Sequence, residues 1–167
     1  MAEETPIPEN PDVPAEQAAS EAPALSVSAQ YIKDLSFEAP TAPGIYGILQ
    51  QTPPDVKINV DVASSQFESN IHEVTLTIEV NCTVGEDTAF VLELEYAGLF
   101  VINVPEEHLA AVLYIECPRL LFPFARNILA DVSRDGGFPP LLLNPVDFVA
   151  MYQAGLENQN TESDESE

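Results

Sequence analysis

The chain has 167 residues and a formal net charge of -23, with 28 acidic but only 5 basic residues. This length fits one domain with a sizeable core. The charge excludes nucleic-acid binding, which needs cations along a phosphate track, and disfavours docking on anionic membranes. It favours solubility and long-range attraction of cationic partners.

Both ends of the chain are acidic and hold no basic residue. Residues 1–24 contain six acids and five prolines, and residues 157–167 contain five acids. Such segments bury too little apolar surface to offset the entropy of ordering, so both are predicted to be disordered tails without a function of their own. Residues 25–156 are the predicted folded domain, where 17 acids and 5 bases leave a charge near -12.

No targeting signal is recognisable at the N-terminus, which lacks a basic start and an apolar run. No uninterrupted apolar stretch reaches membrane-spanning length, so a cytoplasmic location is expected. Cys82 and Cys117 stand at apolar positions. They are expected to be buried thiols, not a disulfide or a metal pair.

Four segments alternate apolar and polar residues with the period of two that is typical of half-buried strands: residues 25–38, 56–62, 73–84 and 90–96. Lys33 breaks the alternation of the first segment, which suggests a β-bulge. The short turn Gly85-Glu86-Asp87 predicts an antiparallel hairpin between the third and fourth strands. Residues 39–55 hold four prolines and two glycines, so they are predicted to be a long functional loop that is too broken for a helix.

A helix is predicted towards Asp135, because residues 121–132 place apolar side chains at helical spacing. Pro118 and Pro123 should make this helix kink or restart. Gly136 and Gly137 should end it. Asn144 followed by Pro145 predicts the N-cap of a second helix. The connector between the two helices, residues 138–143, is so apolar that it must be buried or form a contact surface.

Strands that precede helices indicate an α+β fold: a four-stranded antiparallel sheet with two helices packed on one face and the other face free. The polar side chains of the alternating strands would then place many carboxylates on the free face. Lys57 would offset part of their negative charge, and Val91 would lie between them. Two interpretations stay open, an ordinary solvent-facing sheet or a docking surface for a basic partner. The acidic residues are Asp34, Glu38, Asp61, Glu73, Glu79, Glu93 and Glu95.

Catalytic signatures are lacking in the sequence. His72 and His108 are the two imidazoles, and there is no Gly-rich phosphate loop, nucleophile elbow or paired-cysteine spacing. Neither an enzyme, a metal site nor a cofactor is expected. The alternative from another class is a small helix-on-sheet ligand-binding or thioester enzyme, which would need Asn127 or Asp131 as a buried polar residue.

Four separated motifs carry a resemblance to a known family. They are YIKDLSFEAP from Tyr31, GEDTAF from Gly85, ECPRLLFPFAR from Glu116 and GFPPLLLNPVDF from Gly137. Together they resemble SecB, the bacterial protein-export chaperone, over about residues 25–156.

The resemblance implies a cytosolic homotetramer, a dimer of dimers, that works as an ATP-independent holdase. Such a protein binds unfolded preproteins, keeps them translocation-competent and delivers them to the motor SecA. A SecB-like chaperone that serves a toxin–antitoxin system is an alternative. The positions that match the SecA-docking residues of the family are Asp34, Glu38, Val91 and Glu93.

The resemblance also implies residues for assembly and for client binding. For the second helix, packing against the sheet is an equally good interpretation. The expected tetramer contacts are Phe90, Leu92, Leu94, Tyr96, Phe124 and Ile128. The expected client-binding residues are Ile45, Tyr46, Ile48 and Leu49 in the long loop, Phe138, Leu141, Leu142 and Leu143 in the connector, and Phe148, Met151 and Tyr152 in the second helix.

Overall fold

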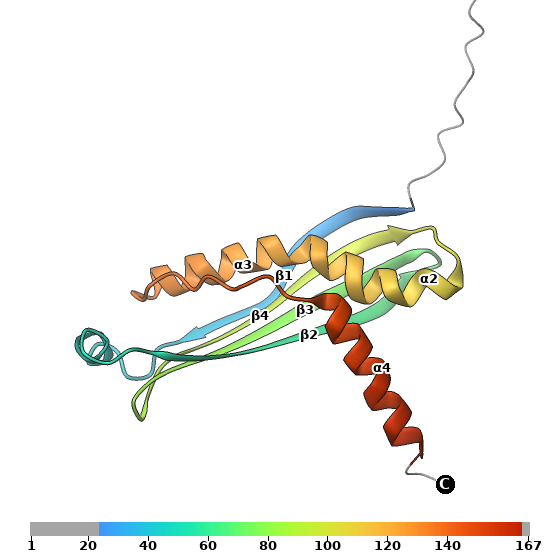
Figure 1. Cartoon of the computed structure of the whole chain (residues 1–167). Helices are drawn as coiled ribbons and strands as arrows, with labels where there is room; N and C mark the ends of the chain where they lie inside the picture. Colours follow the sequence, from blue (N-terminus) through green and yellow to red (C-terminus); the bar gives the residue numbers. More distant parts are fainter. Residues whose placement is uncertain (1–23, 165–167) are drawn as a thin grey trace, which may run out of the picture.

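The computed structural model describes residues 24–164 (Figure 1). Four long strands come first and the main helices follow, so the predicted α+β class is confirmed. The elements are β1 (Leu25–Glu38), α1 (Ile45–Ile48), β2 (Asp55–Glu68), β3 (Ile71–Val84), β4 (Asp87–Ile102), α2 (Glu106–Ala111), a π-helical segment (Val112–Glu116), α3 (Cys117–Asp135) and α4 (Phe148–Asp164).

The strands form one antiparallel sheet in the order β1-β4-β3-β2. The predicted hairpin joins β3 and β4 through Gly85, whose φ of 62° suits a glycine. The predicted bulge is also confirmed, because the β1–β4 register shifts between Ile32 and Asp34. β2 and β4 run six residues beyond their predicted ends, to Glu68 and Ile102.

A single helical layer covers one face of the sheet. α2, the π-helical segment and α3 run on from one another along the sheet (Figure 1). The helical run continues through Pro118, where a kink or restart was predicted, and the irregularity lies directly before this proline in the π-helical segment Val112–Glu116. α3 also continues through Pro123, so the helix does not restart there.

The helical run Glu106–Asp135 is long and apolar enough to cross a membrane by length and composition alone. Its apolar residues are interrupted by charged ones such as Glu116 and Arg119, so it holds no uninterrupted apolar stretch of that length. One face of α3 packs in the core through residues such as Leu121 and Leu129, while Arg119 and Arg126 are exposed on its outer side. This pattern is typical of a helix that covers a sheet.

Gly98 in β4 lets α3 approach the sheet closely. A Cβ added there would lie 2.9 Å from Leu121 Cδ2 and 2.8 Å from Phe100 Cε2, and both side chains are fully buried. Gly98→Ala is therefore expected to lower the free energy of unfolding by about 1–3 kcal/mol in urea titrations. Gly155→Ala in α4, where nothing lies within 4 Å, is the control and should cause no loss. An equal loss in both variants would contradict this packing.

The second helix does not pack along the sheet as predicted. α4 leaves the sheet near its first turn and projects away from it (Figure 1). Its N-cap is Asp147, whose Oδ1 accepts the Ala150 N–H at 3.0 Å, so the prediction of Asn144 is wrong. The long loop also differs from the prediction, because it holds the single helical turn α1.

Of the two predicted tails, residues 1–23 lie outside the described residues. The C-terminal boundary at Leu156 is not the end of an element, because α4 continues to Asp164. Residues 157–164 are therefore helical, which corrects the prediction of a disordered tail for that part of the chain.

Candidate functional site

The free face of the sheet gathers carboxylates from all four strands. Residues directly opposite in antiparallel strands share a face. The register makes one row of Ser36, Glu93, Glu79 and Asn59 across the sheet, and the row of Asp34, Glu95, Thr77 and Asp61 lies beside it. We call the resulting surface the acidic face: Asp34, Glu38, Asp61, Glu79, Glu93 and Glu95.

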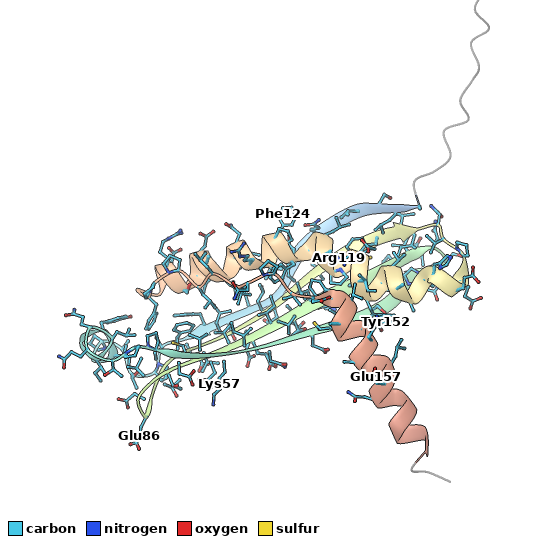
Figure 2. The ribbon with its side chains drawn as sticks, viewed as in Figure 1. Lys57, Glu86, Arg119, Phe124, Tyr152 and Glu157 are labelled. Carbon is cyan, nitrogen blue, oxygen red and sulfur yellow. The ribbon has the colours of Figure 1, made fainter. Side chains whose placement is uncertain are left out.

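Val91 lies within the acidic face as the sequence predicted. It is half-buried and stands opposite Glu38 of β1 and Asn81 of β3, with Lys57 next in that row. A shallow hollow is lined by this valine, Glu93, Glu79 and Lys57. Figure 2 shows Lys57 on the side of the sheet away from the helix. A small apolar anchor with a charged rim is a typical docking arrangement.

All four predicted SecA-docking positions come together on this face. Asp34, Glu38 and Glu93 are exposed, and each stands opposite a residue of the same surface. Glu79, which is directly opposite Glu93, was predicted only as part of the wider carboxylate set. Two like charges in direct opposition repel, so a bound cation would relieve this pair.

Glu73 was expected among the free carboxylates, but β1 neutralises it. Lys33 Nζ lies 2.6 Å from Glu73 Oε1, and the Tyr31 hydroxyl donates to the other carboxylate oxygen. These bonds, that from Lys33 foremost, lower the pKa of Glu73 below its usual range, and they raise the pKa of Tyr31 to about 12. The cluster links the bulge of β1 to β3, and the acidic face ends where Glu73 is neutralised.

Glu73→Gln is expected to lower the free energy of unfolding by about 1 kcal/mol at pH 7, because partly exposed charge-assisted bonds are lost. The folded-state pKa is depressed, so this stabilisation exists above the unfolded pKa of about 4.3 and disappears as pH falls through the folded value. Urea titrations at pH 7 and pH 3 should show the deficit only at pH 7. The exposed Glu68→Gln is the control, and a pH-independent deficit for Glu73→Gln would contradict the ion pair.

The long loop and the inter-helix connector meet at the opposite face of the sheet. The ring of Phe138 lies 5.3 Å from that of Tyr46 and 4.8 Å from that of Phe90, measured between centroids. The Tyr46 hydroxyl donates to the Gly136 carbonyl oxygen at 2.9 Å. The sequence predicted both segments as client-binding loops, and the structure brings them together.

Gly136 and Gly137 end α3 as predicted, and Gly137 has a φ of 85°. A Cβ on Gly136 would lie 2.3 Å from the ring of Phe37, so only glycine fits there. The connector then runs back along α3 (Figure 1), where the buried Ser133 hydroxyl accepts the Leu141 N–H at 2.9 Å. The sequence pattern gave no signal for Ser133 or for Phe37 in these roles.

A groove of about 450 Å³ lies beside the start of α4. Met151 and Tyr152, which were predicted to bind clients, line it and are half-buried. The Tyr152 ring stacks on that of Tyr114 in the π-helical segment, at 6.0 Å and 11°, and the Tyr114 hydroxyl accepts from Ser64 at 3.1 Å. The lining residues are Asp61, Val62, Ala110, Tyr114, Met151, Tyr152, Gly155 and Leu156.

Several predicted client-binding residues are not on the surface. Ile45, Phe138, Leu143 and Phe148 are buried in the core, which corrects their assignment to a contact surface. Leu142 is 68% exposed and Ile48 is 40% exposed. The half-buried members of the set are Tyr46, Leu49, Leu141, Met151 and Tyr152.

The predicted assembly residues are corrected in the same way. Leu92 and Leu94 have no exposed surface, and Phe90 and Tyr96 are also buried, because α3 and the connector of the same chain cover them. A side chain without exposed area cannot add area to a contact with a second copy. Phe124 is 52% exposed, its ring stacked on Tyr96 at 6.4 Å, and Ile128 is half-buried.

The enzyme alternative gains no support from its candidate residues. Asn127 is exposed and donates to Asp131 at 3.0 Å, and Asp131 also pairs with Arg134. His72 is buried, whereas His108 lies at the surface beside Glu107. Within residues 24–164 no group of three His, Cys, Asp or Glu side chains is placed to hold a metal ion. Cys82 and Cys117 are free thiols buried in the core, as predicted.

The family model described as preprotein translocase subunit SecB matches residues 18–159 of the chain. The chain belongs to the SecB family. It is 49% identical to the protein-export protein SecB of Paramagnetospirillum magneticum over 89% of this chain and 96% of that protein. It is 53% identical to the SecB of a Bradyrhizobium species, over 82% and 85% of the two chains.

These relatives make the chain a SecB chaperone of protein export. The fold is also similar to a solved Mycobacterium tuberculosis SecB-like chaperone in complex with a ChAD peptide from the HigA1 antitoxin. The TM-score is 0.62 at 15% identity, over 74% of this chain and 91% of that one. At 15% sequence identity, this similarity shows only that the two chains share a fold.

Proposed function

We propose that this SecB works in the cytoplasm as an ATP-independent holdase that binds unfolded preproteins and passes them to the motor SecA. The observation that carries this proposal is the separation of two surfaces on the sheet: apolar loops and the groove by α4 lie on the helix side, and the acidic face lies on the other. A client and a motor can then bind at the same time.

The groove and the loops suit a client that is defined only by exposed apolar residues. Met151 and Tyr152 offer large contact areas that demand no particular hydrogen-bond partner, and Leu142 is freely accessible. Binding of the unfolded client lowers its free concentration, and this slows both folding and aggregation without any chemistry or cofactor.

The acidic face supports the docking of SecA. Val91 and Glu93 line the shallow hollow, and Glu38 stands opposite Val91 on β1. The net charge of -23 adds long-range attraction for a basic partner surface. Salt should therefore slow the encounter more than it shortens the life of the complex.

An exposed apolar patch supports assembly into a homotetramer. On the helix side of β1, Ile32 and Leu35 are exposed, and Phe124 and Leu120 of α3 are exposed close by, with Tyr96 between the strand and the helix. In Figure 2 Phe124 points away from the sheet. Each copy of the chain has a formal net charge of -23, so copies repel one another. They can therefore associate only through a contact that is substantially apolar.

The holdase proposal is tested by refolding an aggregation-prone substrate in the presence of the purified chain. Suppression should saturate at stoichiometric amounts and need no nucleotide. Suppression at catalytic amounts would contradict it. Co-purification with SecA, rather than with an antitoxin, separates the export role from the toxin–antitoxin alternative.

Tyr152→Asp is expected to weaken suppression about tenfold in the concentration required, because it places a charge in the apolar groove. The fold should persist, since Tyr152 is only half-buried on a helix that projects from the sheet. Gln153→Asp, at the exposed next position, is the control. Equal suppression by all three proteins would remove the groove from the client site.

A further inference from the structure

The start of α4 makes two ring contacts with the rest of the fold. Phe148 is buried, and its ring meets that of Phe122 of α3 at 6.0 Å between centroids and at 74°. One turn later, the Tyr152 ring stacks on that of Tyr114 in the π-helical segment. From residue 153 to residue 158 every side chain is exposed. The direction of α4 is therefore decided within its first two turns.

The two contacts have different mechanical roles. A single buried contact leaves a helix free to swing, whereas a second contact one turn further along fixes its axis. Phe148 and Tyr152 are four positions apart, so they lie on the same side of α4. The helix packs chiefly against the π-helical segment that carries Tyr114 (Figure 1). Phe148 is thus the pivot, and the stack of Tyr114 on Tyr152 holds the angle of α4 about it.

Tyr114 is itself held from the side of the sheet. Ser64 of β2 donates from its Oγ to the Tyr114 hydroxyl at 3.1 Å. The backbone around Tyr114 forms a wide turn, in which the Cys117 N–H bonds to the Val112 carbonyl oxygen five residues back. Leu113 stays buried in the core, while Tyr114 reaches both β2 and α4. Such π-helical turns are rare and often occur at functional sites.

We propose that Tyr114 is a positioning residue, which fixes the direction of α4 by stacking on Tyr152 and so sets how far this helix stands from β2. The inference rests on the proposed holdase function, because α4 carries Met151 and Tyr152. Tyr114 acts on a client through the position of α4. It was not among the residues that the sequence predicted for client binding.

The direct test measures the distance between β2 and α4 in the full-length chain. Spin labels are placed at the exposed positions Asn59→Cys and Glu157→Cys, in labelled chains diluted with unlabelled ones. Figure 2 shows Glu157 on the part of α4 that stands away from the sheet. The native thiols of Cys82 and Cys117 are buried and should not take up the label.

Tyr114→Leu should broaden the distance distribution or shift its mean by about 5 Å. Glu157 lies about 13 Å along the axis of α4 from Phe148, so a change of tilt of about 20° moves it by that amount. The labelled chain with Tyr114 intact should give one narrow distribution. An unchanged distribution in Tyr114→Leu would overturn the proposal and leave the holdase function intact.

Two control variants separate the stack from other effects of losing a tyrosine. Tyr114→Phe keeps the ring and loses only the bond with Ser64, so its distribution should stay close to that of the intact chain. Tyr31→Leu removes a half-buried tyrosine from the free face of the sheet and should leave the distribution unchanged. A change in either control as large as that in Tyr114→Leu would contradict the role of the stack.

Client affinity gives a second readout, with reduced and carboxamidomethylated lysozyme as a basic probe that stays unfolded. Tyr114→Leu should raise the Kd of this probe about fivefold, which matches the loss of one aromatic pair. Combined with Tyr152→Leu, it should cost no more than the larger single effect, because Tyr114 acts through Tyr152. Additive losses would mean that Tyr114 contacts the client independently, and the positioning role would be wrong. Failure of the unmodified chain to bind the probe and to suppress aggregation would instead defeat the holdase proposal, while the label distances would still decide the role of Tyr114.

Discussion

Leu94→Asp is expected to unfold the protein rather than to dissociate an assembly. Leu94 has no exposed surface and lies in the core between β4 and α3. An unpaired carboxylate at such a position costs more than about 4 kcal/mol, a large part of the 5–15 kcal/mol that stabilises a typical domain. Circular dichroism should show loss of the cooperative thermal transition. Leu94→Ala, which leaves only a cavity, should fold with a stability reduced by about 2–5 kcal/mol.

Phe124→Asp is the matched comparison on the exposed side of the same layer. It should retain the thermal transition and change only the sedimentation of the protein, because its ring is half outside the fold. A folded Leu94→Asp chain that sediments as a smaller species would restore that residue to the interface and contradict the core assignment.

Glu93→Lys is expected to reduce the affinity for SecA at least 100-fold while leaving aggregation suppression unchanged. The lysine would stand opposite Glu79, with Val91 and Lys57 around the same hollow, so it would neutralise the centre of the acidic face and repel a basic partner. Titration calorimetry or co-purification measures the effect. Because Glu93 is exposed and lies on the face away from the client groove, neither the fold nor client binding should change.

Glu68→Lys gives the control for net charge. It makes the same change of two charge units on an exposed residue at the other end of the sheet, after the last regular pair of β2. Its affinity for SecA should fall less than about threefold. If both variants lose affinity alike, the interaction is a general attraction to an acidic chain and the docking site is wrong.

The strands and the acidic face could be predicted from the sequence, because the alternation of apolar and polar residues is a local property. Asp34 and Glu93 lie on different strands, yet parity alone placed them on one surface, and the register confirms it. Gly137 after α3 and the hairpin residue Gly85 could also be predicted, since a positive φ strongly favours glycine.

The loops were predicted less well, because their backbone groups are satisfied by distant partners. Asp147 caps α4 in place of Asn144, and Ser133 binds the connector eight residues further along the chain. Phe37 determines that position 136 must be glycine, although it lies about a hundred residues earlier. Such contacts leave no periodic signal in the sequence.

The sequence by itself determined the family, the four strands and which residues of each strand share a face of the sheet, since periodicity and motifs depend only on neighbouring residues. Only the tertiary structure decided which apolar residues are core and which are surface. Leu94 and Phe124 are both apolar residues within a periodic pattern. α3 covers Leu94, whereas Phe124 lies on the outer side of α3 and is exposed to solvent. The path of α4 away from the sheet, and with it the groove beside β2, likewise follows from packing between distant elements and not from any local pattern.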